Sequence, residues 1–181
     1  MSDEVAAIIK TWQEQPMLHP KIEKVVVNLN AGKSGEPLEK ANTVLKEITG
    51  RNPVKRRAKK SVRDFGIREG ESIAVVVTLR KQEAIDFLKK ILPVVDNKIS
   101  RRCFDVRGNF SFGLKEHIDI PGVKYDPEIG IFGMDICVTI NRPGRRITIR
   151  KRQSKQLGPK HVLSAEESIV FVKQTLGVEI I

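Results

Sequence analysis

Short segments in which apolar and polar side chains alternate are the feature that most constrains the fold of this chain. A period of two is typical of β-strands that bury one face, because successive side chains point to opposite sides of a sheet. We predict four such strands, at residues 22–30, 73–80, 109–114 and 133–141. The alternation is strongest at 73–80, so we expect that strand in the interior of a sheet. Two shorter strands are possible at 53–57 and 146–150.

Amphipathic helices separate these strands. Apolar residues recur every three or four positions in four segments, which predicts helices at 3–15, 37–49, 83–92 and 164–177. Gly50 should end the second helix, and Ser164 with Glu167 forms a capping box for the last. The resulting order favours an α+β protein, with an antiparallel sheet and helices packed on one face. This is the split β-α-β (ferredoxin-like or RRM-like) arrangement with a strand extension.

Length and composition favour one domain, residues 1–181, in the cytoplasm. Cys103 and Cys137 stand alone, without the partners that a zinc or redox site needs, so we expect two buried, reduced thiols. No run of 18 apolar residues occurs, and the first ten residues do not resemble a secretion signal. We therefore predict no metal, no cofactor, no membrane and no small-molecule substrate.

Positive charge is concentrated in two segments. Residues 55–68 contain seven Lys or Arg and one acid, and residues 142–160 contain eight Lys or Arg and no acid. Together they hold 15 of the 33 cationic residues, so the remainder of the chain has a small excess of acids. A localised cationic surface on a nearly neutral body attracts polyanions, of which nucleic acid is the most abundant in cells.

Catalysis has little support in the sequence. Gly32, Lys33 and Ser34 follow a predicted strand and precede a helix, where a phosphate-binding loop would lie. A Walker A motif would need a glycine at Val27, inside that strand, so a turn before a helix explains these residues better. The histidines are scattered, and no pair of carboxylates stands out. We expect no catalytic residue, although an RNA-modifying enzyme is an alternative interpretation.

RNA is a better candidate ligand than DNA. The chain lacks a helix-turn-helix, zinc finger or basic zipper, but a DNA-binding architectural protein remains an alternative. Residues 107–113 only partly match the aromatic signature of single-strand RNA readers, and aromatic residues make up 5% of the chain. Few rings are available for base stacking, so recognition should depend on phosphates, sugars and the shape of a folded RNA.

Several motifs in the same order resemble the ribosomal protein family numbered five of the large subunit. The match includes Val26 to Gly32, Ile48 to Pro53, Ala58 to Val62, Phe65 to Gly70, Thr78 to Arg80, Arg107 to Phe110, Glu116 and His117, Tyr125 and Asp126, and Gly130 to Ile136. It spans roughly residues 20–152. The block from Ile131 to Asp135 and the basic segment after Gly144 resemble the archaeal and eukaryotic branch, and the chain is interpreted as archaeal in type.

The resemblance implies a structural, non-enzymatic component of the ribosome. Members of the family hold 5S rRNA in the central protuberance, contact large-subunit rRNA, and extend a loop toward P-site tRNA and the head of the small subunit. Carried over by position, that loop is residues 58–68. Residues 153–181, a basic segment and a helix, follow the matched core. The expected partners are therefore 5S rRNA, large-subunit rRNA, P-site tRNA and neighbouring ribosomal proteins.

Candidate contact residues follow from both arguments. Asn28 and Thr78 match family residues on the RNA-facing sheet, and the alternation independently places them on polar strand faces. Arg51 stands where bacterial members usually have glutamine and is expected to contact a phosphate. The full set predicted for rRNA is Asn28, Asn30, Arg51, Thr78, Arg80, Arg142, Arg145 and Arg146. For tRNA, backbone contacts are expected from Lys59, Lys60, Ser61 and Arg63, with Phe65 as the packing anchor of the loop.

Overall fold

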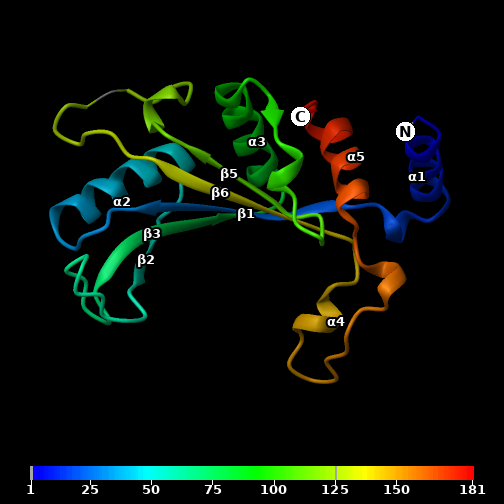
Figure 1. Cartoon of the computed structure of the whole chain (residues 1–181), viewed down its shortest axis with the longest axis horizontal. Helices are drawn as coiled ribbons and strands as arrows, with labels where there is room; N and C mark the ends of the chain where they lie inside the picture. The colour runs from blue at the N-terminus through cyan, green and yellow to red at the C-terminus, as the bar shows by residue number, and fades with distance from the viewer. Residues whose placement is uncertain (1, 125) are drawn as a thin grey trace.

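A computed structural model describes residues 2–124 and 126–181 (Figure 1). Tyr125, one of the residues quoted for the resemblance, lies outside the described residues. The main sheet has five strands in the order β2-β3-β1-β6-β5, and all neighbours are antiparallel. Its strands are β1 (Lys21–Asn30), β2 (Val54–Arg57), β3 (Ser72–Leu79), β5 (Phe110–Leu114) and β6 (Met134–Asn141). Because β3 lies between β1 and β2, and β1 lies between β3 and β6, the predicted α+β split β-α-β arrangement is confirmed.

Four helices match the predicted ones to within about a residue at each end. They are α1 (Ser2–Glu14), α2 (Glu36–Thr49), α3 (Gln82–Ile91) and α5 (Ala165–Leu176). Short 3₁₀ helices connect the elements: η1 (Pro16–Leu18), η2 (Leu92–Val95), η3 (Arg101–Cys103), η4 (His117–Asp119) and η5 (Pro159–His161). Within the described residues, no helix is long and apolar enough to cross a membrane.

Helix ends follow the expected chemistry. Gly50 ends α2 in the left-handed conformation at φ +66°, which costs a glycine little because it has no Cβ. Ser164 caps α5 by accepting a hydrogen bond from the Glu167 backbone N–H, and the Glu167 carboxylate accepts one from the Ser164 N–H. Both ends of the capping box are therefore made, as predicted.

The hydrophobic core lies between one face of the sheet and the helices. Val25, Val27 and Leu29 of β1 are fully buried there. The apolar residues of α2 and α3 pack against them, including Leu45 and Leu88. One face of each strand is thereby removed from water, which is the main source of stability in such a layer.

Two features differ from the prediction. Residues 146–150 do not form a strand: α4 (Arg146–Ile149) is a single helical turn. Gly144, at φ +96°, turns the chain away from the sheet, and both edges of β6 are already paired with β1 and β5, so no edge is available there. The second feature is a small parallel pair that the alternation did not predict, β4 (Lys98–Ile99) with β7 (Glu179–Ile180). Two residues are too few to show a period.

The opposite face of the sheet is left open by the large helices. Figure 1 shows α3 and α5 above the strands, the loop between β2 and β3 at the β2–β3 edge of the sheet, and the segment around α4 below the other end of the sheet. The loop and the α4 segment contain most of the cations of the two basic segments. We call residues 58–68 the basic loop and residues 142–160 the basic arm. The basic loop therefore begins near the Asn30 end of β1, and the basic arm begins near its Lys21 end.

Candidate nucleic-acid interface

The open face of the sheet is defined by strand register. Asn28 of β1 lies opposite Val76 of β3 on one side and Asp135 of β6 on the other. Residues directly opposite one another share a face. The open face consists of Lys24, Val26, Asn28, Asn30, Val54, Arg56, Ala74, Val76, Thr78, Ser111, Gly113, Asp135, Cys137 and Thr139. Most of these side chains are small or uncharged, so this face is not itself strongly basic.

The predicted contact residues Asn28, Asn30 and Thr78 all lie on this face. Asn30 and Thr78 are exposed, and Asn28 is half-buried. None of the three side chains makes a hydrogen bond to another described residue. Their amide and hydroxyl groups are therefore free to bind a partner that covers the sheet.

Acidic and reactive groups on the open face sit beside Asn28. Asp135 is its direct neighbour across the strand pair, and Cys137 lies two residues further along β6. Partial burial of the thiol, and to a lesser degree the Asp135 carboxylate, raises the pKa of Cys137, which favours its neutral form. The predicted burial of both cysteines is wrong, because Cys137 is exposed on the open face and Cys103 is half-buried.

The basic loop is folded rather than extended. Val62 and Ile67 pair across it, and the Ala58 N–H donates to the Glu71 carbonyl oxygen at 2.7 Å. The carboxylate of Glu71 accepts hydrogen bonds from the Ser34 hydroxyl and from the Arg68 N–H. These bonds lower the pKa of Glu71, the Ser34 hydroxyl contributing most. An ionised Glu71 thus fastens the base of the loop to the turn after β1.

Within the basic loop, Lys59, Lys60 and Arg63 are exposed, as a backbone-binding role requires. Ser61 is partly committed, because its hydroxyl accepts a hydrogen bond from the Glu69 N–H at 2.8 Å. The prediction that Phe65 anchors the loop by packing is wrong, since 71% of this residue is exposed. Internal hydrogen bonds hold the loop instead, and the Phe65 ring faces solvent.

The arginines of the basic arm differ in exposure, and the buried one has a structural role. Only 4% of the Arg142 side chain is exposed; its guanidinium donates to the Glu167 carboxylate at 2.5 Å and to the Lys160 carbonyl oxygen at 3.2 Å. Arg142 therefore ties the arm to the capping box of α5, and its guanidinium is not accessible to an RNA phosphate in this conformation. Arg145 is half-buried beside Asn141 and Glu23, and Arg146 is exposed.

Arg51 and Arg80 meet at the end of β3. Both line a shallow hollow that also includes Thr78. The Arg51 guanidinium donates twice to the Glu83 carboxylate, at 2.5 and 3.1 Å. This hydrogen bonding, together with the charge of Glu83, raises the pKa of Arg51. An RNA phosphate at Arg51 would therefore have to share the guanidinium with Glu83 or displace it.

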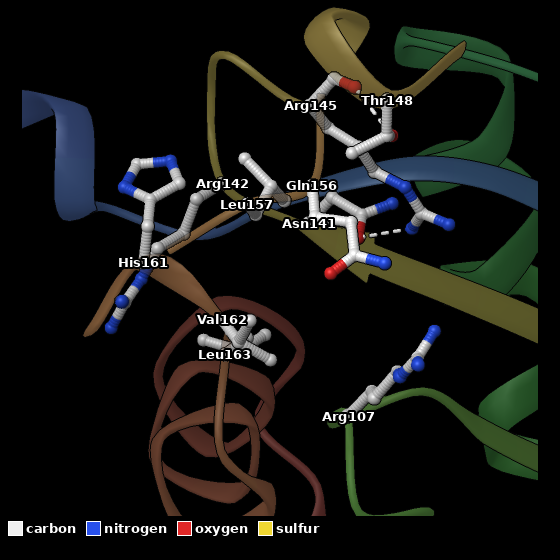
Figure 2. A pocket seen from close by; sticks show the side chains of 10 residues that line it. All are labelled: Arg107, Asn141, Arg142, Arg145, Thr148, Gln156, Leu157, His161, Val162 and Leu163. Atoms are coloured by element: carbon white, nitrogen blue, oxygen red, sulfur yellow. Dashed lines mark hydrogen bonds between the residues drawn. The ribbon is translucent and has the colours of Figure 1, made fainter. Parts of the chain in front are cut away.

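Sequence reasoning missed three cations that the fold places near this interface. Lys24 lies on the open face because it is an even number of residues from Asn28 in β1. Arg56 lies there because it pairs directly with Ala74 of β3. Strand parity could have identified Lys24. Arg107 reaches the junction between β6 and the basic arm, where it lines a pocket with Asn141 and Arg145 (Figure 2). No local pattern links Arg107 to residues more than 30 positions away.

The described residues contain no group of three or more potential metal ligands. Val27, the position at which a Walker A motif would need glycine, lies within β1 and is paired with both β3 and β6. The turn from Gly32 to Gly35 leads directly into α2. The backbone around Val27 thus has no loop that could surround a phosphate.

Comparisons with known proteins agree with this architecture. Residues 15–68 match the family model for ribosomal protein L5, and residues 72–171 match the model for the C-terminus of the same ribosomal family. The large ribosomal subunit protein uL5 of Pyrobaculum aerophilum is 50% identical, covering 94% of this chain and 98% of the relative. Those of Aeropyrum pernix and Sulfolobus acidocaldarius are 49% and 46% identical, covering 97% and 93% of this chain and 92% and 95% of the relatives. The chain therefore belongs to the L5 family of large-subunit ribosomal proteins, in its archaeal form.

Proposed function

We propose that this structural ribosomal protein binds 5S rRNA on the open face of its sheet and contacts large-subunit rRNA in the central protuberance. In the same proposal, the basic loop reaches P-site tRNA and the neighbouring head of the small subunit. The observation that carries the proposal is the open sheet face, with exposed cations of the basic loop and the basic arm at its two ends (Figure 1).

The chemistry of this surface suits a folded RNA. Uncharged amide and hydroxyl groups at Asn28, Asn30 and Thr78 can bond to sugars and phosphates without the cost of displacing an ion pair. The cations of the basic arm neutralise phosphates of this RNA, and those of the basic loop neutralise phosphates of the tRNA. Because the sheet is rigid and carries few exposed aromatic rings, it is better suited to contact the sugars and phosphates of a duplex than to stack against unpaired bases.

A filter-binding comparison tests this proposal. Folded 5S rRNA, duplex DNA of equal length and ATP would be titrated with the full chain at the same salt concentration. We expect 5S rRNA to be retained at a much lower protein concentration than duplex DNA, and ATP not to be retained. Equal retention of RNA and DNA would indicate a general polyanion binder and contradict the proposal.

A further inference from the structure

The junction between β6 and the basic arm contains a cavity. It has a volume of about 430 Å³, within the range of roughly 300–1,000 Å³ that is common for small-molecule sites. Asn141, the last residue of β6, forms part of its wall and has the parity of the open-face residues Cys137 and Thr139. The cavity therefore begins where the open face ends.

Arg107, Arg142 and Arg145 line the cavity, and none of its lining residues is acidic. Arg142 and Arg145 have carboxylate partners outside the lining, in Glu167 and Glu23, whereas Arg107 forms no ion pair with a described residue. Figure 2 shows Arg107 extending from its loop toward the space that Asn141 and Arg145 border from the other side.

Hydrogen-bonding capacity also remains unused in this wall. The buried Nε of Arg142 has no partner among the described residues. Arg145 uses only one of its terminal nitrogens, Nη1, for its contacts with Asn141 and Glu23. The Arg142 guanidinium is inaccessible, but the Arg145 side chain is 37% exposed, so its unused nitrogens can donate to an acceptor in the cavity.

Apolar side chains also line the cavity. Leu157 is half-buried, and Val162 is 40% exposed. Neither belongs to the main hydrophobic core. A ligand that combines a planar apolar group with an anionic group would match both sets of lining residues, and a nucleotide has this composition.

We propose that the cavity holds a single unstacked nucleotide of the RNA bound on the open face. Its phosphate would lie between Arg107 and Arg145, and its base would lie against Leu157 and Val162. Unstacked nucleotides in bulges and loops are the usual targets of specific contacts in folded RNA. This inference rests on the proposed function, because the nucleotide belongs to the RNA that covers the sheet.

The first test alters the apolar and the cationic lining of the cavity separately. Val162→Trp fills the space beside the apolar lining without changing the charge, and Arg107→Gln removes the unpaired cation. Arg102→Gln is a matched control, since Arg102 is exposed and lies outside the cavity. We expect Val162→Trp and Arg107→Gln each to weaken 5S rRNA binding about tenfold, the scale of losing one base contact. The control should bind like the wild type.

Chemical probing of 2′-hydroxyl reactivity in the same complexes locates the nucleotide. In the wild-type complex, one nucleotide should differ from its neighbours in reactivity. That signature should disappear with Val162→Trp and Arg107→Gln and persist with Arg102→Gln. If both cavity variants bind 5S rRNA like the wild type and leave the reactivity pattern unchanged, the proposal is overturned while RNA binding on the open face stands.

A second test uses the wild-type protein and therefore does not depend on whether a variant folds. Backbone amide signals would be followed by NMR during titration with AMP, UMP, adenosine and inorganic phosphate. We expect AMP or UMP to shift signals from residues 141–148 and 156–163 at lower concentrations than phosphate or adenosine. Equal responses to phosphate and to the nucleotides would show an anion site only and overturn the assignment. Because no RNA is present, this result is independent of 5S rRNA binding.

Discussion

At the scale of single residues, Asn28 and Thr78 provide the sharpest test of the open face. Both lie on the open face, and neither side chain forms a hydrogen bond with another described residue. Asn28→Ala or Thr78→Val should weaken 5S rRNA binding by about 1–3 kcal/mol, because an RNA group would be left buried and unpaired. Filter binding measures the loss, and circular dichroism checks that the fold is unchanged.

Thr43→Val is the matched control for Thr78→Val. Thr43 is exposed on α2, in the helical layer, where its hydroxyl bonds only to the Glu39 carbonyl oxygen within its own helix. It should leave the affinity for RNA unchanged. Wild-type affinity in both open-face variants, with an unchanged circular dichroism spectrum, would mean that RNA binds elsewhere on the molecule.

Arg142 should contribute to stability rather than to contact with RNA. Its guanidinium is buried against the Glu167 carboxylate, so Arg142→Met leaves that charge without its partner. Breaking a buried ion pair costs about 3 kcal/mol, measured as a lower free energy of unfolding in urea. Arg146→Met, an exposed change in the same arm, should cost less than about 0.5 kcal/mol. Equal effects of the two substitutions would contradict the structural role of Arg142.

The sequence pattern predicted on which strand face a residue lies better than it predicted whether a side chain is buried. Alternation was sufficient to place Asn28 and Thr78 on a polar face, because strand parity is a local property of the sequence. It could not show that Arg142 is buried, since its partner Glu167 lies 25 residues further along the chain and is brought near by folding. The exposure of Phe65 was missed for a related reason, because aromatic rings are usually buried and the local pattern does not reveal how the loop is held.

At the scale of elements, the basic loop should be separable from the 5S rRNA site. It projects from the β2–β3 hairpin at one end of the sheet and carries its own exposed cations (Figure 1). Replacing Lys59, Lys60 and Arg63 together with glutamine should leave 5S rRNA binding and incorporation into subunits nearly intact. It should weaken retention of P-site tRNA on assembled ribosomes, because phosphate contacts would be lost.

The control for this triple variant removes three exposed lysines from helices, at Lys46, Lys89 and Lys173. It lowers the net charge equally and should retain tRNA like the wild type. Loss of 5S rRNA binding in the isolated loop variant would instead place the basic loop in the primary rRNA site, and the assignment to tRNA would be wrong.

Among the elements, those with a clear period were predictable and those fixed by context were not. Each long strand and helix carries enough residues to show its period, and Gly50 and Ser164 mark helix ends by their own chemistry. Residues 146–150 also contain alternating apolar side chains. They form a helical turn because both edges of the preceding strand, β6, are already paired, which is a property of the whole fold.

At the scale of the whole molecule, the surface of the sheet and most of the localised positive charge lie in different parts of the fold. The sheet presents a nearly neutral surface, while most of the localised positive charge lies in the basic loop and the basic arm at opposite ends of the sheet (Figure 1). An RNA on the sheet would be attracted by the basic arm and oriented by the sheet, and the basic loop would attract a second RNA. The cavity beside Arg107 lies where the sheet meets the basic arm, so a nucleotide held there would fix the register of the RNA.

The location of the cations in the basic arm and the basic loop predicts how binding depends on salt concentration. Each neutralised phosphate releases counterions, so the logarithm of the affinity for 5S rRNA should fall linearly with the logarithm of salt concentration, by about 0.7–0.9 per contact. Replacing the exposed Arg146, Lys151 and Arg152 of the basic arm with glutamine should make that slope shallower by about 2–3. The triple variant of the basic loop should leave the slope unchanged, because its phosphates belong to a different RNA. Filter binding between roughly 50 and 200 mM salt measures all three slopes. A flat response in the wild type would show that the basic segments do not bind the RNA backbone, and equal changes in both triple variants would show that 5S rRNA spans both the basic loop and the basic arm.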